Sequence, residues 1–170
     1  MVIGYVRHGE KSATGLTKLG RKQAKDVCKQ LTENYVKIYC SPTARCHETA
    51  QIIAKQLKLP IEVCYEMHDR RGLTEPPKNE KEQEFYDNFL NYDYVDKGLG
   101  IETCKEYIDR NFREFQKIVD MHYVNNENVL IVAHSATLYC LNAFVSGIPD
   151  NHKIIWMRAG NCSKVLMEII

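Results

Sequence analysis

The amino-acid sequence predicts an α/β fold, a three-layer α/β/α sandwich around a mostly parallel sheet. Strand-like apolar runs alternate with helix-like amphipathic stretches along the 170 residues. The apolar run at 129–133 is uninterrupted, as is typical of a parallel strand buried on both faces. A chain of this length can bury roughly 70% of its unfolded surface without a disulfide or a metal. We therefore expect a single domain over residues 1–170.

In the first half of the chain, three short strands alternate with two helices. Residues 2–6 are apolar and predict the first strand. Thr17 is a suitable N-cap for the first helix, because apolar residues recur after it at helical spacing. The next expected elements are a strand at 36–40, a helix over 43–57 and a short strand at 61–63.

The second half opens with an irregular, cap-like segment at about 66–100, which is rich in charges and aromatic residues. Within it, a helix is expected at about 81–92. The last expected elements are a long helix over 102–123, the strand at 129–133, a helix at about 136–146 and strands at 154–157 and 164–169.

Composition excludes several classes of protein. Lys and Arg number 23 against 22 Asp and Glu, a net charge of +1, which argues against a nucleic-acid binder. No apolar run approaches the ~18 residues needed to cross a membrane, and the first apolar stretch is too short for a signal peptide. The seven cysteines form no C-x-x-C pair and are expected to be free thiols. We therefore expect a cytoplasmic protein with no membrane or nucleic-acid partner, no metal and no cofactor.

Four potentially cationic residues have related positions in the predicted sheet. His8 and His134 each follow a strand and precede a helix, Arg7 adjoins His8, and Arg45 follows the strand at 36–40. Ligands of open α/β sheets bind beyond the carboxyl ends of the strands, so these side chains are expected to converge there. Any one of them alone would be an ordinary structural or surface residue. Together they repel one another unless an anion joins them, and phosphate suits guanidinium groups.

The segment Arg7-His8-Gly9-Glu10 resembles the signature of the histidine phosphatase superfamily, the phosphoglycerate mutase-like proteins. The stretch 100–103 with Arg110 is similar to that family's later Gly-Glu-Ser segment, with one extra residue. Further segments resemble family motifs in the same order, at 16–24, 40–50, 129–135 and 161–163. The resemblance spans nearly the whole chain and implies a phosphoglycerate mutase-like fold.

The resemblance also implies roles for individual residues. His8 would be the nucleophile that forms a phosphohistidine. Arg7, Arg45 and His134 would hold the phosphoryl oxygens, helped by the backbone N–H groups at Ser135. Ser12 lies in a loop that is shorter than in larger family members, and we expect it to contribute a substrate contact. No metal or other cofactor is required.

A carboxylic acid would protonate the leaving oxygen, and two candidates remain open. The family places a glutamate four residues before a glycine, but counting back from Gly72 leads to His68. Aligning Met67 with the family's usual leucine puts Asp69 in that position, while Glu66 is the other acidic residue nearby. We favour Asp69.

The resulting hypothesis is a metal-independent phosphomonoester hydrolase that works through a phosphohistidine on His8. The alternatives are a phosphoglycerate mutase-type phosphotransferase and a non-catalytic phosphate- or phosphopeptide-binding domain. The segment at 66–100 leaves little room for the additional substrate-binding elements of the mutases, so we rank the phosphatase first. The substrate is expected to be a small phosphorylated metabolite or a phosphoprotein, and the sequence does not indicate the oligomeric state.

Overall fold

The computed structural model describes residues 1–70, 77–148 and 159–170, and a mixed five-stranded sheet lies at its centre. The strand order is β3-β2-β4-β1-β5, in which β1 to β4 run parallel and β5 runs antiparallel to β1. Their bounds are β1 (Val2–Arg7), β2 (Tyr35–Cys40), β3 (Ile61–Val63), β4 (Asn128–Ala133) and β5 (Lys164–Glu168). The strand expected at 154–157 lies outside the described residues.

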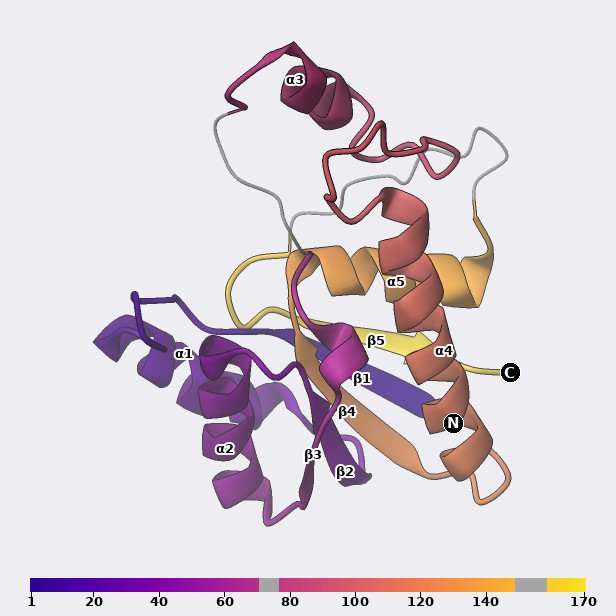
Figure 1. Cartoon of the computed structure of the whole chain (residues 1–170). Coiled ribbons are helices and arrows are strands. Elements are labelled where there is room, and N and C mark those ends of the chain that lie inside the picture. Colours follow the sequence, from indigo (N-terminus) through magenta and orange to yellow (C-terminus); the bar gives the residue numbers. More distant parts are fainter. Residues whose placement is uncertain (71–76, 149–158) are drawn as a thin grey trace.

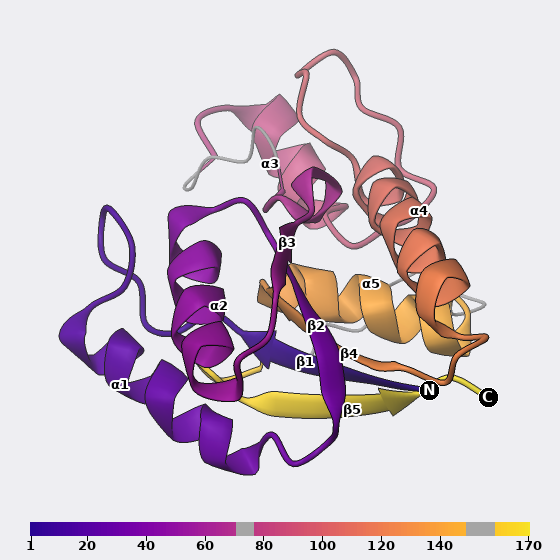
Figure 2. The same ribbon diagram turned by 90° about the horizontal axis from the view of Figure 1, so that it is seen from below.

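Helices cover both faces of the sheet, which confirms the predicted sandwich. Figures 1 and 2 show α1 (Lys18–Val27) and α2 (Ala44–Leu57) on one face and α4 (Cys104–His122) and α5 (Ser135–Ser146) on the other. The central strand β4 packs its alternate side chains into two separate cores. Val129 and Ile131 contact the core under α4 and α5, whereas Leu130 and Val132 contact the core under α1 and α2. This explains why the run 129–133 has no polar residue.

Side-chain caps determine where several helices begin. The Thr17 hydroxyl accepts a hydrogen bond from the Gly20 N–H at 3.0 Å and starts α1, as expected. Thr103 and Glu106 form a reciprocal capping box that starts α4. Two short 3-10 turns, η1 (Cys28–Gln30) and η2 (Tyr65–Met67), follow α1 and β3.

The cap-like segment contains a shorter helix than the sequence predicts. Here α3 (Glu80–Asp87) ends five residues before the expected end at 92. The Asn88 side chain donates to the Glu84 carbonyl at 2.9 Å, and the chain continues in turns stabilised by Asn91. Short polar side chains of this kind compete for the backbone hydrogen bonds that a helix needs. The spacing of apolar residues, on which the longer prediction was based, does not register this effect. Figure 1 shows α3 standing apart from the sheet, beyond the N-terminal end of α4.

The cysteines were expected to be free thiols. All seven cysteine thiols are free and six of them are buried, which fits their interpretation as small apolar residues.

Within residues 1–70, 77–148 and 159–170, no helix combines the length and the apolar character that a membrane span needs.

Candidate active site

The two histidines meet at the carboxyl edge of the sheet because β1 and β4 are parallel neighbours. Arg7 at the end of β1 pairs with Ala133 at the end of β4, so His8 and His134 leave the sheet side by side. The His8 N–H donates to the Ala133 carbonyl at 3.0 Å, and the two ring centroids are 5.5 Å apart. The predicted convergence of these residues is therefore present in the structure.

His8 is held as a neutral imidazole with a defined tautomer. Its Nδ1 lies 2.8 Å from the Gly9 carbonyl oxygen, which can only accept, so Nδ1 carries the proton and Nε2 keeps its lone pair. Burial lowers the pKa of His8 from 6.5 to about 4. The Gly9 carbonyl opposes this shift, whereas the positive charges of Arg45 and Arg7 reinforce it. At neutral pH the ring is thus neutral, and its Nε2 is a potential nucleophile.

The loop that carries His8 is fixed by close backbone packing. A Cβ atom at Gly9 would lie 2.5 Å from the Gly20 carbonyl oxygen, and one at Gly20 would lie 2.2 Å from the Glu10 carbonyl oxygen. Only glycine permits this approach of residues 9–10 to the start of α1. The Glu10 N–H also donates to Gln23 and the Gly9 N–H to Thr49. These contacts explain why the signature at 7–10 is accompanied by the motif at 16–24.

Arg45, Asp69 and His134 form a connected group opposite His8. The Arg45 guanidinium donates to Asp69 Oδ2 at 2.5 Å and to His134 Nδ1 at 3.3 Å. Since guanidinium nitrogens only donate, His134 accepts at Nδ1 and donates from Nε2 to the Ser41 hydroxyl at 2.8 Å. Burial lowers the pKa of His134, so this ring is also neutral in the free protein. Arg45 occupies the first turn of α2 and Asp69 follows η2.

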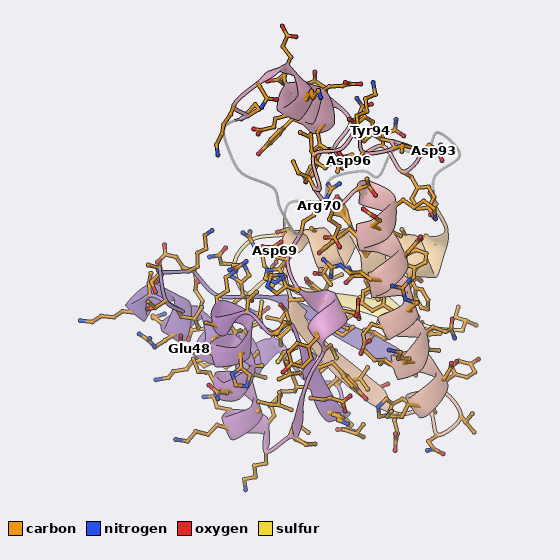
Figure 3. The ribbon with its side chains drawn as sticks, viewed as in Figure 1. Glu48, Asp69, Arg70, Asp93, Tyr94 and Asp96 are labelled. Carbon is orange, nitrogen blue, oxygen red and sulfur yellow. The ribbon has the colours of Figure 1, made fainter. Side chains whose placement is uncertain are left out.

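The Asp69 carboxylate is ionised in this arrangement. Burial raises its pKa, whereas the Arg45 guanidinium at 2.5 Å and the hydrogen bond from the Arg70 N–H lower it. The net pKa lies below the ordinary value. Figure 3 shows Asp69 between the β3–η2 segment and the carboxyl end of the sheet. In the free protein this carboxylate is therefore a proton acceptor.

These side chains line one cavity of about 380 Å³ that is suited to an anion. Its walls are Arg7, His8, Glu10, Lys11, Arg45, Asp69, His134, Ser135, Ala136 and Asn161. Because both imidazoles are neutral, the charged side chains of the cavity are three cations and two carboxylates. The cations are Arg7, Lys11 and Arg45, and the carboxylates are Glu10 and Asp69. The buried Nε atoms of Arg7 and Arg45 have no hydrogen-bond partner in the part of the chain that the structure describes. The first N–H groups of α5, at Ser135 and Ala136, add donors at a helix N-terminus.

The structure does not bring every expected site residue into this cavity. Ser12 is exposed and is not among the cavity walls; its N–H and hydroxyl instead close a turn with Gly15. Glu66 lines a different cavity, of about 450 Å³, together with Glu102 and Arg110. Of the two candidate acids, Asp69 alone lines the cavity that contains His8. Gly72, from which the position of the acid was counted in the sequence, lies outside the described residues.

Three cavity residues, Glu10, Lys11 and Asn161, were not identified as site residues from the sequence, although Glu10 is part of the signature at 7–10. Lys11 directly follows the Arg-His-Gly-Glu signature, and Asn161 begins the segment 161–163 that resembles a family motif. Their proximity to recognised motifs was the available signal. Among residues 1–70, 77–148 and 159–170, no group of three His, Cys, Asp or Glu side chains is placed to hold a metal ion.

The low pKa of His8 predicts a pH-dependent stability. Because His8 titrates near 4 when folded and near 6.5 when unfolded, the unfolded chain binds more protons between these values. The neutral state of His8 therefore stabilises the folded protein fully above pH 6.5, and this stabilisation is lost as the pH falls towards 4. By the relation of 1.36 kcal/mol per pKa unit, its full size is about 3 kcal/mol. Chemical denaturation from pH 7 to 4.5 should therefore show a shallower loss of stability in His8→Gln than in the wild type, and parallel curves would contradict this prediction.

Comparisons with known proteins agree with this fold. The model of the histidine phosphatase superfamily (branch 1) matches residues 5–169. The chain is 31% identical over 167 residues to the "Uncharacterized phosphatase PhoE" of Bacillus subtilis (strain 168), covering 85% of this chain and 77% of that protein.

Solved structures show the same architecture. YhfR of Bacillus stearothermophilus superposes with a TM-score of 0.79 at 25% identity, covering 99% of this chain and 91% of that one. A phosphoserine phosphatase of Entamoeba histolytica, in complex with phosphoserine, superposes with a TM-score of 0.72 at 20% identity, covering 97% and 89%. The resemblance inferred from the motifs is thus confirmed, and the chain belongs to the histidine phosphatase superfamily, branch 1.

Proposed function

We propose that this protein is a metal-independent phosphomonoester hydrolase that works through a phosphohistidine on His8. The observation that carries the proposal is the state of His8, a neutral imidazole with a free Nε2 lone pair in a cavity rich in donors for an anion. Phosphoryl transfer needs little from a protein beyond an aligned nucleophile and charge stabilisation.

In the first step, His8 Nε2 attacks phosphorus and the bond from phosphorus to the ester oxygen breaks. Arg7, Arg45 and the first N–H groups of α5 stabilise the negative charge on the three phosphoryl oxygens. The leaving oxygen takes a proton from the Asp69 carboxyl group. In the second step, Asp69 removes a proton from water, the water oxygen bonds to phosphorus, and inorganic phosphate leaves as the N–P bond breaks.

Asp69 must be protonated for the first step although it is ionised in the free protein. Its low pKa results from the positive charge of Arg45 and the hydrogen bond from the Arg70 N–H, which oppose its burial. A phosphate dianion that binds Arg45 takes up this positive charge and adds a negative charge beside the carboxylate. Both effects raise the pKa of Asp69, so substrate binding itself prepares the acid.

The proposed substrate is a small phosphorylated metabolite or a phosphorylated side chain. A cavity of about 380 Å³ lies within the ordinary range for small-molecule sites. Relatives of the same fold include a phosphoserine phosphatase and a mycobacterial glucosyl-3-phosphoglycerate phosphatase solved with VO3, both of which act on small phosphate esters according to their names. Assays with para-nitrophenyl phosphate and with 3-phosphoglycerate test hydrolysis and isomerisation separately. Isomerisation without hydrolysis would favour a mutase, and binding without turnover would favour a phosphate-binding domain.

Activity is expected to survive chelation, since the proposed chemistry takes its positive charge from arginine side chains and a helix N-terminus. Turnover of para-nitrophenyl phosphate should be equal before and after dialysis against EDTA. Vanadate should inhibit, because it adopts the five-coordinate geometry of phosphorus in the transition state. Activity that disappears in EDTA and returns with Mg²⁺ or Zn²⁺ would contradict the proposed mechanism.

Arg45→Ala is expected to lower kcat/KM by about 10- to 100-fold. The substitution removes charge-assisted hydrogen bonds, each worth roughly 1.5–3 kcal/mol. It should leave the fold intact, because Arg45 lies at the wall of an open cavity. Steady-state kinetics with circular dichroism test this, and Lys55→Ala, an exposed position on the same helix, is the matched control. An unchanged kcat/KM would identify Arg45 as an ordinary surface residue.

A further inference from the structure

A buried ion pair next to the proposed site has no part in the chemistry described above. Arg110 of α4 donates from Nε to Glu102 Oε1 at 2.5 Å and from Nη2 to Glu102 Oε2 at 2.9 Å. Their side chains are 4% and 8% exposed. Removing two charges from water is costly, and a buried ion pair is weak evidence of a stabilising role. Both residues belong to the stretch 100–103 with Arg110 that resembles a family motif, to which no function was assigned above.

The same guanidinium binds backbone carbonyls at Glu66 and at the proposed acid itself, Asp69. Arg110 Nη1 donates to the Glu66 carbonyl, and Nη2 lies 3.4 Å from the Asp69 carbonyl oxygen. Residues 68–70 belong to no helix or strand, so side chains must hold this segment. Glu102 keeps the guanidinium in place by accepting from two of its nitrogens.

A second arginine ties the same segment to Glu102. Arg70 donates from Nε to the Glu102 carbonyl at 3.1 Å, and its backbone N–H donates to Asp69 Oδ1 at 3.0 Å. Arg70 also donates to the Phe89 carbonyl and stacks on the Phe89 ring at 4.0 Å, which joins the cap-like segment to this network. Figure 3 shows Asp69 and Arg70 in succession on the segment that passes the N-terminal end of α4.

From these contacts we propose that Arg110, held by Glu102, is a positioning residue for Asp69. It fixes the segment 66–69 so that the Asp69 carboxylate stays in contact with Arg45 and His134. This inference rests on the proposed function, in which Asp69 transfers the proton. Displacement of a catalytic group by about 1 Å can reduce the rate on the order of 100-fold. Loss of Arg110 should therefore impair proton transfer more than phosphate binding.

The test compares an alkyl phosphate with para-nitrophenyl phosphate, whose leaving group needs no proton. In Arg110→Met, the ratio of kcat/KM for the aryl substrate to that for the alkyl substrate should rise about tenfold or more above the wild-type ratio. Arg110→Lys, which keeps the charge but cannot span both carbonyls and Glu102, should show a smaller rise. Arg113→Met is the matched control, because Arg113 is exposed on the same helix and has no hydrogen bond or ion pair within the described part of the chain. Its ratio should equal that of the wild type.

A second design guards against loss of folding, since Arg110→Met leaves the Glu102 carboxylate buried and unpaired. The double variant Arg110→Met/Glu102→Gln removes both charges and should show the same rise in the ratio. In an Asp69→Asn background, Arg110→Met should raise the ratio little further, because both changes act on one proton transfer. Equal losses for both substrates, or full additivity with Asp69→Asn, would overturn the positioning role. A wild-type protein that turns over neither substrate would instead overturn the proposed function, and this inference with it.

Discussion

Replacing His8 with alanine is expected to abolish the covalent intermediate and to reduce turnover on the order of 10⁴-fold or more, the scale on which loss of a nucleophile acts. His8 is 5% exposed, and its ring is neutral and fixed by the Gly9 carbonyl, so its Nε2 has the lone pair that attack on phosphorus requires. Wild-type protein mixed with ³²P-labelled substrate and quenched in alkali, which preserves phosphohistidine, should carry label on the peptide that contains His8.

The controls address other possible acceptors of the phosphoryl group. His47→Ala, a partly exposed histidine on α2 outside the cavity, should be labelled like the wild type. Cys46 lies 3.6 Å from His134 Nε2, but burial raises the pKa of this thiol to about 12, so it is not a thiolate at neutral pH. Label on a serine or cysteine peptide, or no label in a single turnover, would overturn the assignment of His8.

The central features of the fold and site could be predicted because they follow from local rules. The run 129–133 is apolar at every position, and such a strand must be covered on both faces. Parallel neighbours end at the same edge of a sheet, so residues that follow them, such as His8 and His134, must meet. Thr17 caps α1 as its residue type and position predict.

Other features depend on contacts between distant segments and were not predictable from one sequence. Ser12 was expected at the site, but its loop is closed by its own turn, whereas the adjacent Lys11 lines the cavity. Asn161 reaches the cavity because β5 lies antiparallel beside β1. The contacts of Arg110 with residues 66 and 69 join positions about 40 apart, and no local pattern indicates them.

The choice between Asp69 and Glu66 as the acid shows how the structure sharpens a prediction. Asp69→Asn is expected to slow phosphorylation by an alkyl phosphate roughly 10²–10⁴-fold, the usual contribution of general acid catalysis. The alkyl leaving group departs as a strongly basic alkoxide unless it is protonated. Para-nitrophenolate is stable without a proton. With the aryl substrate, the phosphorylation rate of the same variant should therefore be much closer to the wild-type rate. Rapid-quench measurement of the phosphorylation step isolates this effect, because Asp69 is also proposed to activate water in the second step.

Glu66→Gln is the matched control. The Glu66 side chain lines the separate cavity beside Arg110, and the Arg110 contact at this residue is made through the backbone carbonyl, which the substitution preserves. This variant should show little dependence on the leaving group. A selective loss with Glu66→Gln and none with Asp69→Asn would reverse the assignment. If neither variant is selective, the proton has another source, and His68 is the next residue to test, because it precedes Asp69 and its Nδ1 lies 2.8 Å from the Asp69 carbonyl oxygen.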